Sequence, residues 1–232
     1  MSASIARRGE NSFAVPRVAK AAWVPRTAFG LVERPSEAPF NPAALHFAQD
    51  AEIYAEGDEA AYVYKVVSGM VRTCKFQNDG RRHIDAFHKQ GDMLGFELGA
   101  EHALSAEAVI DCVVVPYRRR TLEARAVHDE TMALYLYTCA MQSLEQTRQH
   151  AQLLGRASAL QKLAVFLLGL AAARSDAVEL AMTRQDIADY LGLTIETVSR
   201  TLSHLERDGA IRLAAARRIE LVDRVALRTL CG

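Results

Sequence analysis

Hydrophobic residues between Thr183 and Leu205 recur at helical spacing and predict two short helices joined by a tight turn. Thr183 and Thr194 are of the type that caps the N-terminus of a helix, and Gly192 suits the left-handed residue at which the first helix ends. Each helix has one apolar face, which consists of Ile187, Ala188 and Leu191 in the first and of Val198, Leu202 and Leu205 in the second. These faces can close one small core, which is the pattern of a helix-turn-helix.

The second of these helices carries polar side chains on its outward face, and they predict contacts to DNA bases. A helix-turn-helix presents the N-terminal half of its second helix to base edges in the major groove. There Arg200 can pair in a bidentate way with guanine, Glu196 can accept from the amino group of cytosine, and Ser199 can donate or accept. The alternative is an ordinary surface ion pair between Glu196 and Arg200, which are one helical turn apart. The predicted base-reading set is Ile195, Glu196, Ser199 and Arg200, with support at the phosphates from Thr183, Thr194 and Thr197.

The segments on either side of these helices extend the unit to a winged helix-turn-helix. Residues 158–173, SALQKLAVFLLGLAAA, are so apolar that we expect a helix buried on several sides beneath the motif. After the second helix, AIRLAAARRIELV predicts two short strands around residues 214–216, which place Arg217 and Arg218 near phosphates. We expect Asp223 to cap a last short helix.

Short alternating runs broken by glycine fill the stretch from Ala51 to Tyr117 and predict strands. The run AYVYKVVSG alternates before its glycine, and VRTCKF leads to Asn78-Asp79-Gly80, a strong hairpin signal. The runs IDAFHKQGD and AVIDCVVVPYR continue the pattern. We therefore expect an antiparallel barrel or jelly roll of about eight short strands.

From Arg118 onward the sequence predicts helix with an apolar seam at near-heptad spacing. Leu134 and Met141 lie in one row of this helix, and Tyr137 and Leu144 lie in the adjacent row. Polar residues occupy its other faces. Pairing with a second copy of the chain would bury the seam, and packing against the chain's own barrel is the alternative.

Together these elements predict an α+β fold in four parts. They are an irregular N-terminal arm (residues 1–44), an antiparallel β-roll (45–127), a dimerisation helix (128–154) and a winged helix-turn-helix domain (155–232). Five of the six prolines lie within the first 42 residues, which prevents a long helix in the arm.

Composition narrows the function without identifying it. The 232 residues have a formal net charge of zero, and residues 151–232 hold eleven Lys or Arg against nine Asp or Glu. Any affinity for DNA must therefore depend on where the arginines lie rather than on bulk charge. No run approaches the roughly eighteen apolar residues of a membrane span, and the first residues lack the apolar stretch of a secretory signal. We expect a cytoplasmic protein without a membrane partner.

The cysteines are too widely spaced to form a metal or iron–sulfur motif, so no cofactor is expected from them. In a cytoplasmic protein they are expected to be reduced thiols. Cys231, near the end of the chain, is the candidate for redox reactivity. The full set is Cys74, Cys112, Cys139 and Cys231.

In the order of its elements and in its glycines, the chain resembles the CRP/FNR family of bacterial transcription regulators from about Leu45 to Leu230. The matching glycines stand in YAEGD, VVSG, QGD and LGFE. The resemblance implies that the N-terminal roll has the fold of a cyclic-nucleotide-binding domain. Residues 196–200, ETVSR, resemble the FNR and FixK branch, for which the implied half-site is TTGAT or TTGA facing its inverted repeat.

Two departures from the family's patterns decide the subgroup. Members that bind cyclic AMP need an arginine in the roll pocket, after the segment that here is Gly95 to Glu97, and no arginine lies between Arg82 and Arg118. The oxygen sensor FNR carries an N-terminal cysteine cluster, whereas no cysteine precedes Cys74 here. The resemblance is thus to the FixK-like subgroup. It implies a homodimeric regulator, mainly an activator, that recruits RNA polymerase to microaerobic, denitrification or nitrogen-fixation genes without cyclic nucleotide or iron–sulfur cluster.

Two other functions stay open at this point. A cupin-like enzyme would need an H-x-H pair with further metal ligands, whereas His83 and His88 are five apart and would usually fall on opposite faces of a strand. A sensor of the same family could instead bind haem through His46, His83, His88 or His102.

Overall fold

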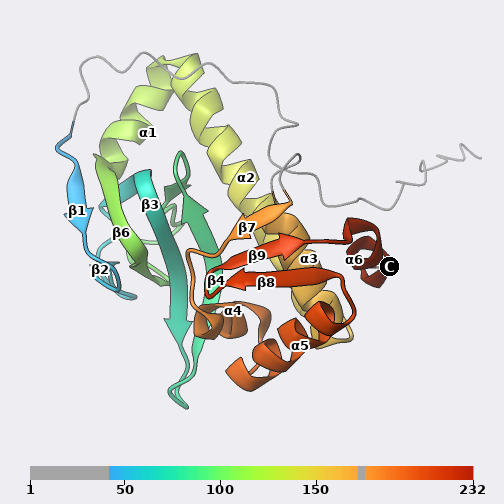
Figure 1. The fold of residues 1–232 in the computed structure, drawn as a ribbon. Coiled ribbons are helices and arrows are strands. Elements are labelled where there is room, and N and C mark those ends of the chain that lie inside the picture. Colours follow the sequence, from blue (N-terminus) through green and yellow to red (C-terminus); the bar gives the residue numbers. More distant parts are fainter. Residues whose placement is uncertain (1–41, 172–175, 232) are drawn as a thin grey trace, which may run out of the picture.

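The computed structural model describes residues 42–171 and 176–231, which form an N-terminal β-roll, two connecting helices and a C-terminal lobe (Figure 1). The α+β fold class predicted from the sequence is confirmed. The N-terminal arm predicted for residues 1–44 lies outside the described residues, apart from residues 42–44. Among the described helices, none combines the length and apolar character that crossing a membrane requires.

The roll is an antiparallel sheet in the order β1-β6-β3-β4, in which β2 also pairs with β6 and β5 with β3. The described residues of the roll thus form six strands instead of about eight short ones. The difference arises because β3 and β6, of 15 and 14 residues, continue through several β-bulges and bend where separate strands were expected. The strands are β1 (Leu45–Phe47), β2 (Glu52–Tyr54), β3 (Tyr62–Phe76), β4 (Arg82–Lys89), β5 (Met93–Leu94) and β6 (Ser105–Arg118).

Gly69 lies where β3 bends against β6, and only glycine fits this position. Its φ of 81° is in the left-handed region. A Cβ atom there would lie 2.4 Å from the carbonyl oxygen of Asp111 on β6. The SG pair that suggested the end of a strand therefore marks a bulge inside one long strand.

Two helices connect the roll to the C-terminal lobe, α1 (Arg119–His128) and α2 (Glu130–Leu154). They are separated at Asp129, whose extended backbone ends α1 and whose carboxylate accepts from the Met132 backbone N–H at 3.1 Å to cap α2. α2 has 25 residues and runs from the far end of α1 to the C-terminal lobe (Figure 1). The long helix predicted from the apolar seam corresponds to α2.

The C-terminal lobe has the winged arrangement predicted from the sequence, with one additional strand. Its sheet has the order β7-β9-β8, in which β8 and β9 are the predicted wing and β7 was not expected. Asp223 accepts from the N–H groups of Val225 and Ala226 and caps α6, as predicted. The elements are α3 (Ala159–Leu170), β7 (Ala177–Glu179), α4 (Arg184–Leu191), α5 (Ile195–Arg207), β8 (Ile211–Ala215), β9 (Arg218–Leu221) and α6 (Arg224–Leu230).

The roll and the C-terminal lobe share a hydrophobic core where α4 packs against β4. Phe87 of β4 contacts Tyr190 of α4 with ring centroids 5.2 Å apart. His150 of α2 stacks on the same tyrosine at 4.0 Å, and its Nε2 atom donates to the Tyr190 carbonyl oxygen at 2.7 Å. Val109 of β6 belongs to the same buried cluster as the core of the lobe. The lobe is therefore held to the roll through α4.

We expect the protein to lose stability on acidification through His150. Burial holds the pKa of His150 below its ordinary value of 6.5, although the Tyr190 carbonyl and nearby Asp85 oppose this, while His83 and Lys162 add to it. The unfolded chain binds this proton near pH 6.5 and the folded protein only at lower pH. The contribution of His150 to the free energy of unfolding is thus fully present above pH 6.5, and it is lost as the pH falls through the pKa of His150 in the folded protein.

Urea unfolding at a series of pH values measures this effect. Between about pH 7 and 5.5, the free energy of unfolding should fall less steeply for His150→Gln than for the wild type. In His150→Gln the free energy of unfolding should still fall with pH, because burial also lowers the pKa of His102. Identical slopes for the two proteins would show that His150 does not contribute.

Candidate DNA-binding site

The two helices of the predicted motif are present, and local hydrogen bonds fix their ends. Thr183 and Asp186 form a reciprocal cap: the Thr183 hydroxyl accepts from the Asp186 N–H at 3.1 Å, and the Asp186 carboxylate accepts from the Thr183 N–H at 2.9 Å. Gly192 ends α4 with a left-handed φ of 62°. Thr194 caps α5 by accepting from the Thr197 N–H at 3.2 Å. The predicted helix boundaries and caps are confirmed.

Burial of the apolar faces determines which side of α5 points outward. Both predicted faces are buried in one core, in which α5 packs against α3 and α4 packs against α5, with side chains at most 1% exposed. The faces consist of Ile187, Ala188 and Leu191 on α4 and Val198, Leu202 and Leu205 on α5. Ser158 caps α3, which confirms the predicted apolar helix beneath the motif. The remaining side of α5 is left to solvent.

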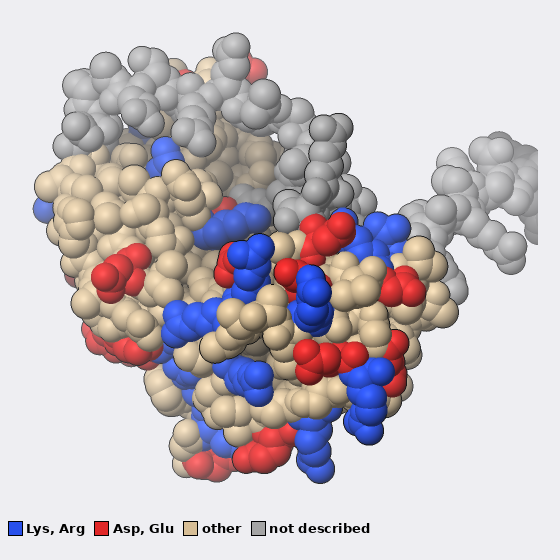
Figure 2. Space-filling model, in the orientation of Figure 1, with Lys and Arg blue, Asp and Glu red and all other residues tan. Residues whose placement is uncertain are grey.

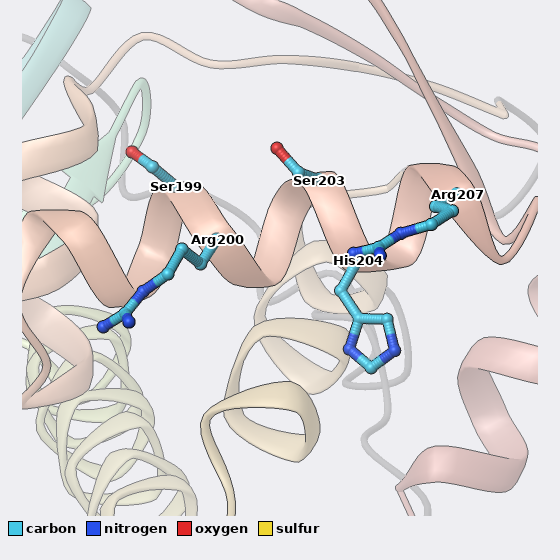
Figure 3. A pocket seen from close by; sticks show the side chains of 5 residues that line it. All are labelled: Ser199, Arg200, Ser203, His204 and Arg207. Carbon is cyan, nitrogen blue, oxygen red and sulfur yellow. The ribbon is translucent and has the colours of Figure 1, made fainter.

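This outward side of α5 presents a row of polar side chains beside a hollow of about 510 Å³ (Figure 3). Sequence reasoning found Ser199 and Arg200 but missed Ser203, His204 and Arg207. The missing signal was helical spacing, because these residues lie one and two turns after the first two. The His204 Nε2 atom lies 3.3 Å from a carboxylate oxygen of Asp208. We name the set Ser199, Arg200, Ser203, His204 and Arg207 the α5 reading face.

Glu196 and Ile195 lie in the first turn of α5, next to the reading face. Both are exposed, with Ile195 at 37%. The pKa of Glu196 is lowered by its own backbone N–H, then by the Thr194 hydroxyl, with a smaller contribution from Arg200. Glu196 is therefore a carboxylate at neutral pH, which can only accept hydrogen bonds. That is the state needed to accept from cytosine.

The two helices of the motif meet at Ser199. An Nη1 atom of Arg184, the first residue of α4, lies 3.4 Å from the Ser199 hydroxyl. Arg184 is a further exposed cation, beside the reading face, and sequence reasoning also missed it. Its position at the first turn of a helix, directly after a capping threonine, could have identified it.

The wing supplies further exposed arginines. Arg217 lies in the turn between β8 and β9, where its carbonyl accepts from the Leu180 N–H at 2.7 Å, and Arg218 is the first residue of β9. A guanidinium Nε of Arg218 lies 3.6 Å from Glu179, and the two side chains are 52% and 69% exposed. Figure 2 shows cationic and anionic side chains interspersed over this lobe rather than a uniformly basic face. Individual arginines, not a bulk field, must carry any attraction for phosphates.

A row of large apolar side chains on α2 is exposed to solvent. Their exposed fractions are 51% for Leu134, 62% for Tyr137, 40% for Met141 and 42% for Leu144. These are the residues predicted from the seam. In the described residues the row does not pack against the roll.

Cys231 is less accessible than its place in the sequence suggested. It is half-buried, and its thiol donates to the Leu227 carbonyl at 3.1 Å. Burial raises its pKa, with Arg156 opposing. The side chain is therefore a thiol rather than the reactive thiolate at neutral pH.

Three of the histidines considered as haem ligands have neighbours within the chain. His83 stacks on His150 at 5.7 Å, His88 lies 3.2 Å from the Thr73 hydroxyl, and His102 stacks on Tyr54 at 3.7 Å. Throughout residues 42–171 and 176–231, no three His, Cys, Asp or Glu side chains gather in a way that could hold a metal ion.

Comparison with known proteins assigns both halves of the chain. Residues 44–127 match the model of the cyclic nucleotide-binding domain, and residues 161–230 match the Crp-like helix-turn-helix domain. The nitrogen fixation regulation protein FixK of Azorhizobium caulinodans is 48% identical over 191 residues, which cover 79% of this chain and 77% of that protein. FixK of Rhizobium meliloti is 40% identical over 78% of this chain and 83% of that protein.

A solved structure supports the same assignment. The structure of FixK2 from Bradyrhizobium japonicum superposes with a TM-score of 0.78 at 42% identity and covers 83% of this chain and 98% of that one. These relatives are transcription regulators and not enzymes, which removes the cupin-like alternative. The chain therefore belongs to the CRP/FNR family of transcription regulators and is a regulator of the FixK type with a DNA-binding helix-turn-helix.

Proposed function

We propose that the chain acts in the cytoplasm as a homodimer that binds the inverted repeat TTGAT-N4-ATCAA and mainly activates transcription. The α5 reading face carries this proposal, because it places the guanidinium of Arg200 and the Ser199 hydroxyl on an exposed helix, with the Glu196 carboxylate one turn before Arg200. Arg200 reads guanine, Glu196 accepts from cytosine and Ser199 assists. Ile195 completes the contact in the first turn. Thr183, Thr194, Thr197, Arg217 and Arg218 support the backbone contacts.

The exposed row on α2 supports the dimer. Leu134, Tyr137, Met141 and Leu144 span three turns of one helix face, and four large apolar side chains in a row are costly to leave in water. A second copy packed on the same row would bury them and would place two α5 helices about one turn of DNA apart. Dimer and palindrome then share one symmetry axis.

The interior of the roll supports action without a cyclic nucleotide. Beside Gly95, the space next to the glycine–glutamate segment is filled by Tyr64 and His102, which are 9% and 2% exposed. The Glu97 carboxylate lies 3.6 Å from Nδ1 of His102. A phosphate bound in this space would lie near the Glu97 carboxylate, and the segment that follows supplies no arginine to balance its charge. The phosphate would therefore be poorly held.

The names of the relatives point to the target genes. Because the two FixK proteins are named nitrogen fixation regulation proteins, we assign this chain to nitrogen-fixation genes. Its resemblance to the FixK-like subgroup adds microaerobic and denitrification genes as candidates. Activation requires that the bound dimer also contact RNA polymerase.

Fluorescence anisotropy with the purified, ligand-free protein in air tests this function. A duplex with TTGAT-N4-ATCAA should bind at least about 1,000-fold more tightly than a scrambled duplex at the same salt concentration. Equal affinities would contradict effector-free recognition of this site and would favour a ligand-gated sensor. An absorption band of bound haem in the purified protein would then identify the haem-sensing alternative.

For the wing we expect a loss of affinity without a loss of specificity. Arg217→Ala should weaken binding to the palindrome and to scrambled DNA by a similar factor, because a phosphate contact carries no sequence information. The slope of log affinity against log salt should become shallower by about 1 for each contact removed. Arg120→Ala, at an exposed position on α1, is the charge-matched control and should leave the slope unchanged. A loss confined to the palindrome would mean that Arg217 reads bases.

A further inference from the structure

Asp186, at the start of α4, links the DNA-binding motif to the roll. One carboxylate oxygen accepts from the N–H and the hydroxyl of Thr183, at 2.9 and 2.7 Å, and completes the cap of α4. The other accepts from two arginines of the roll, Arg72 on β3 at 3.2 Å and Arg82 on β4 at 2.5 Å. A capping residue needs only the first set of bonds. The second set therefore serves the contact between roll and lobe.

Both arginines are held by further carboxylates on either side of this contact. Arg82 donates from Nε to Asp189 on α4 at 2.9 Å. Arg72 donates from Nε to Glu107 on β6 at 2.8 Å, and its Nη2 reaches Asp50 at 3.0 Å. We name Arg72, Arg82, Glu107, Asp186 and Asp189 the α4 clamp.

The clamp is buried and depends on both of its arginines. The side chains of Asp186 and Arg72 are 3% and 6% exposed, and those of Asp189, Glu107 and Arg82 are between 11% and 17% exposed. The carboxylates outnumber the guanidinium groups, so loss of one arginine leaves a buried carboxylate without its counter-charge. Movement of α4 away from the roll would return this carboxylate to water, so the loss of an arginine favours that movement.

The other end of α4 is fixed independently. The Tyr190 carbonyl accepts from His150 of α2, and the Tyr190 ring lies against His150 and Phe87. A helix held at both ends cannot rotate against the surface beneath it. Since α4 and α5 share one core, the direction of α5 relative to α2 is fixed by these contacts.

The covalent connection alone would not fix that direction. Between the end of α2 and the start of α3 the chain passes through Gly155, Arg156, Ala157 and Ser158 outside helix. Figure 1 shows α4 between the roll and α5, and both clamp arginines come from the roll, on β3 and β4. Their side chains are only 6% and 17% exposed and are bonded to carboxylates, so neither guanidinium is free to bind a phosphate.

From this geometry we infer that Arg72 and Arg82 are positioning residues for DNA recognition: they hold the two reading faces of the dimer at the spacing of the palindrome without contacting DNA. The inference rests on the proposed function, a homodimer on an inverted repeat. A rigid dimer binds its second half-site as an intramolecular event, whereas lobes that swing freely must be ordered at each binding event. The clamp should thus matter for the second half-site and not for the first.

Binding of the full-length protein to two duplexes tests this inference, one duplex with the whole palindrome and one with a single half-site. Arg82→Gln should lower affinity for the palindrome by about tenfold or more and leave half-site affinity within about twofold of wild type. Asp189→Asn removes only one partner of Arg82 and should act in the same direction more weakly. Arg82→Lys keeps the charge and should restore part of the loss.

Arg81→Gln is the matched control. Arg81 is the neighbour of Arg82 and makes an ion pair with Asp79 at 2.6 Å, but its side chain is 80% exposed and outside the clamp. The variant loses the same charge and should bind both duplexes as the wild type does. Hydrogen exchange of the α4 backbone gives a readout without DNA, and exchange should be faster in Arg82→Gln than in Arg81→Gln.

The outcomes separate the inference from the proposed function. Unselective binding by the wild type would refute the proposed palindrome, and unchanged α4 exchange in Arg82→Gln would still refute the clamp. If the wild type is selective, an equal loss on both duplexes would assign Arg82 to folding or direct contact. Unchanged or tighter palindrome binding would equally overturn a positioning role.

Discussion

Met141→Glu should turn a dimer into a monomer and lower affinity for the palindrome by at least about 100-fold. Met141 lies near the middle of the exposed apolar row on α2 and is 40% exposed in the single chain. In a twofold symmetric contact both copies contribute the same surface, so the substitution introduces two carboxylates at one interface. Their desolvation and mutual repulsion oppose association of the two copies. A monomer then binds each half-site separately, without the high effective concentration that a dimer provides for the second half-site.

Sedimentation at micromolar concentration and anisotropy on the palindrome measure the two parts of this prediction. Ser143→Glu is the matched control, because it adds the same charge to an exposed position on another face of α2. It should leave mass and affinity unchanged. A Met141→Glu protein that remains a dimer would show that the α2 row packs against something other than a second copy.

The helix-turn-helix could be predicted in detail because its determinants are local. The caps at Thr183 and Thr194 act over three residues, and the left-handed turn at Gly192 is a property of one residue. Burial of Leu202 and Leu205 follows from the spacing of apolar residues along a single helix. Such signals are complete within a short stretch of sequence.

Features that depend on tertiary contacts could not be found in this way. Bonds from Arg72 and Arg82 to Asp186 join residues 114 and 104 positions apart, and in the sequence all three look like ordinary surface charges. The strand β7 pairs with β9 across the whole motif, so three residues of weak strand character gain their structure from a distant partner. In β3, the pairing of Gly69 with β6 decides between a turn and a bulge.

The role of Arg200 in specificity gives the second large effect. Arg200→Ala should lose about 1–3 kcal/mol on the TTGAT palindrome, which is a factor of about 5 to 150. The loss should disappear on a duplex in which the guanine of each half-site is replaced by adenine, because the bidentate acceptor pair is then absent for both proteins. The four combinations of protein and duplex form a cycle that isolates the interaction between Arg200 and guanine.

Two features of the structure favour this outcome over a general electrostatic role. Arg200 belongs to the reading face in the N-terminal half of α5, where a recognition helix enters the groove, and the Glu196 carboxylate one turn before it can accept from the paired cytosine. Arg207, two turns further along the same face, has the same charge but lies in the half that leaves the groove. Arg207→Ala should therefore weaken both duplexes alike. If Arg200→Ala also weakened both alike, Arg200 would be a phosphate contact and the guanine would be read by another side chain.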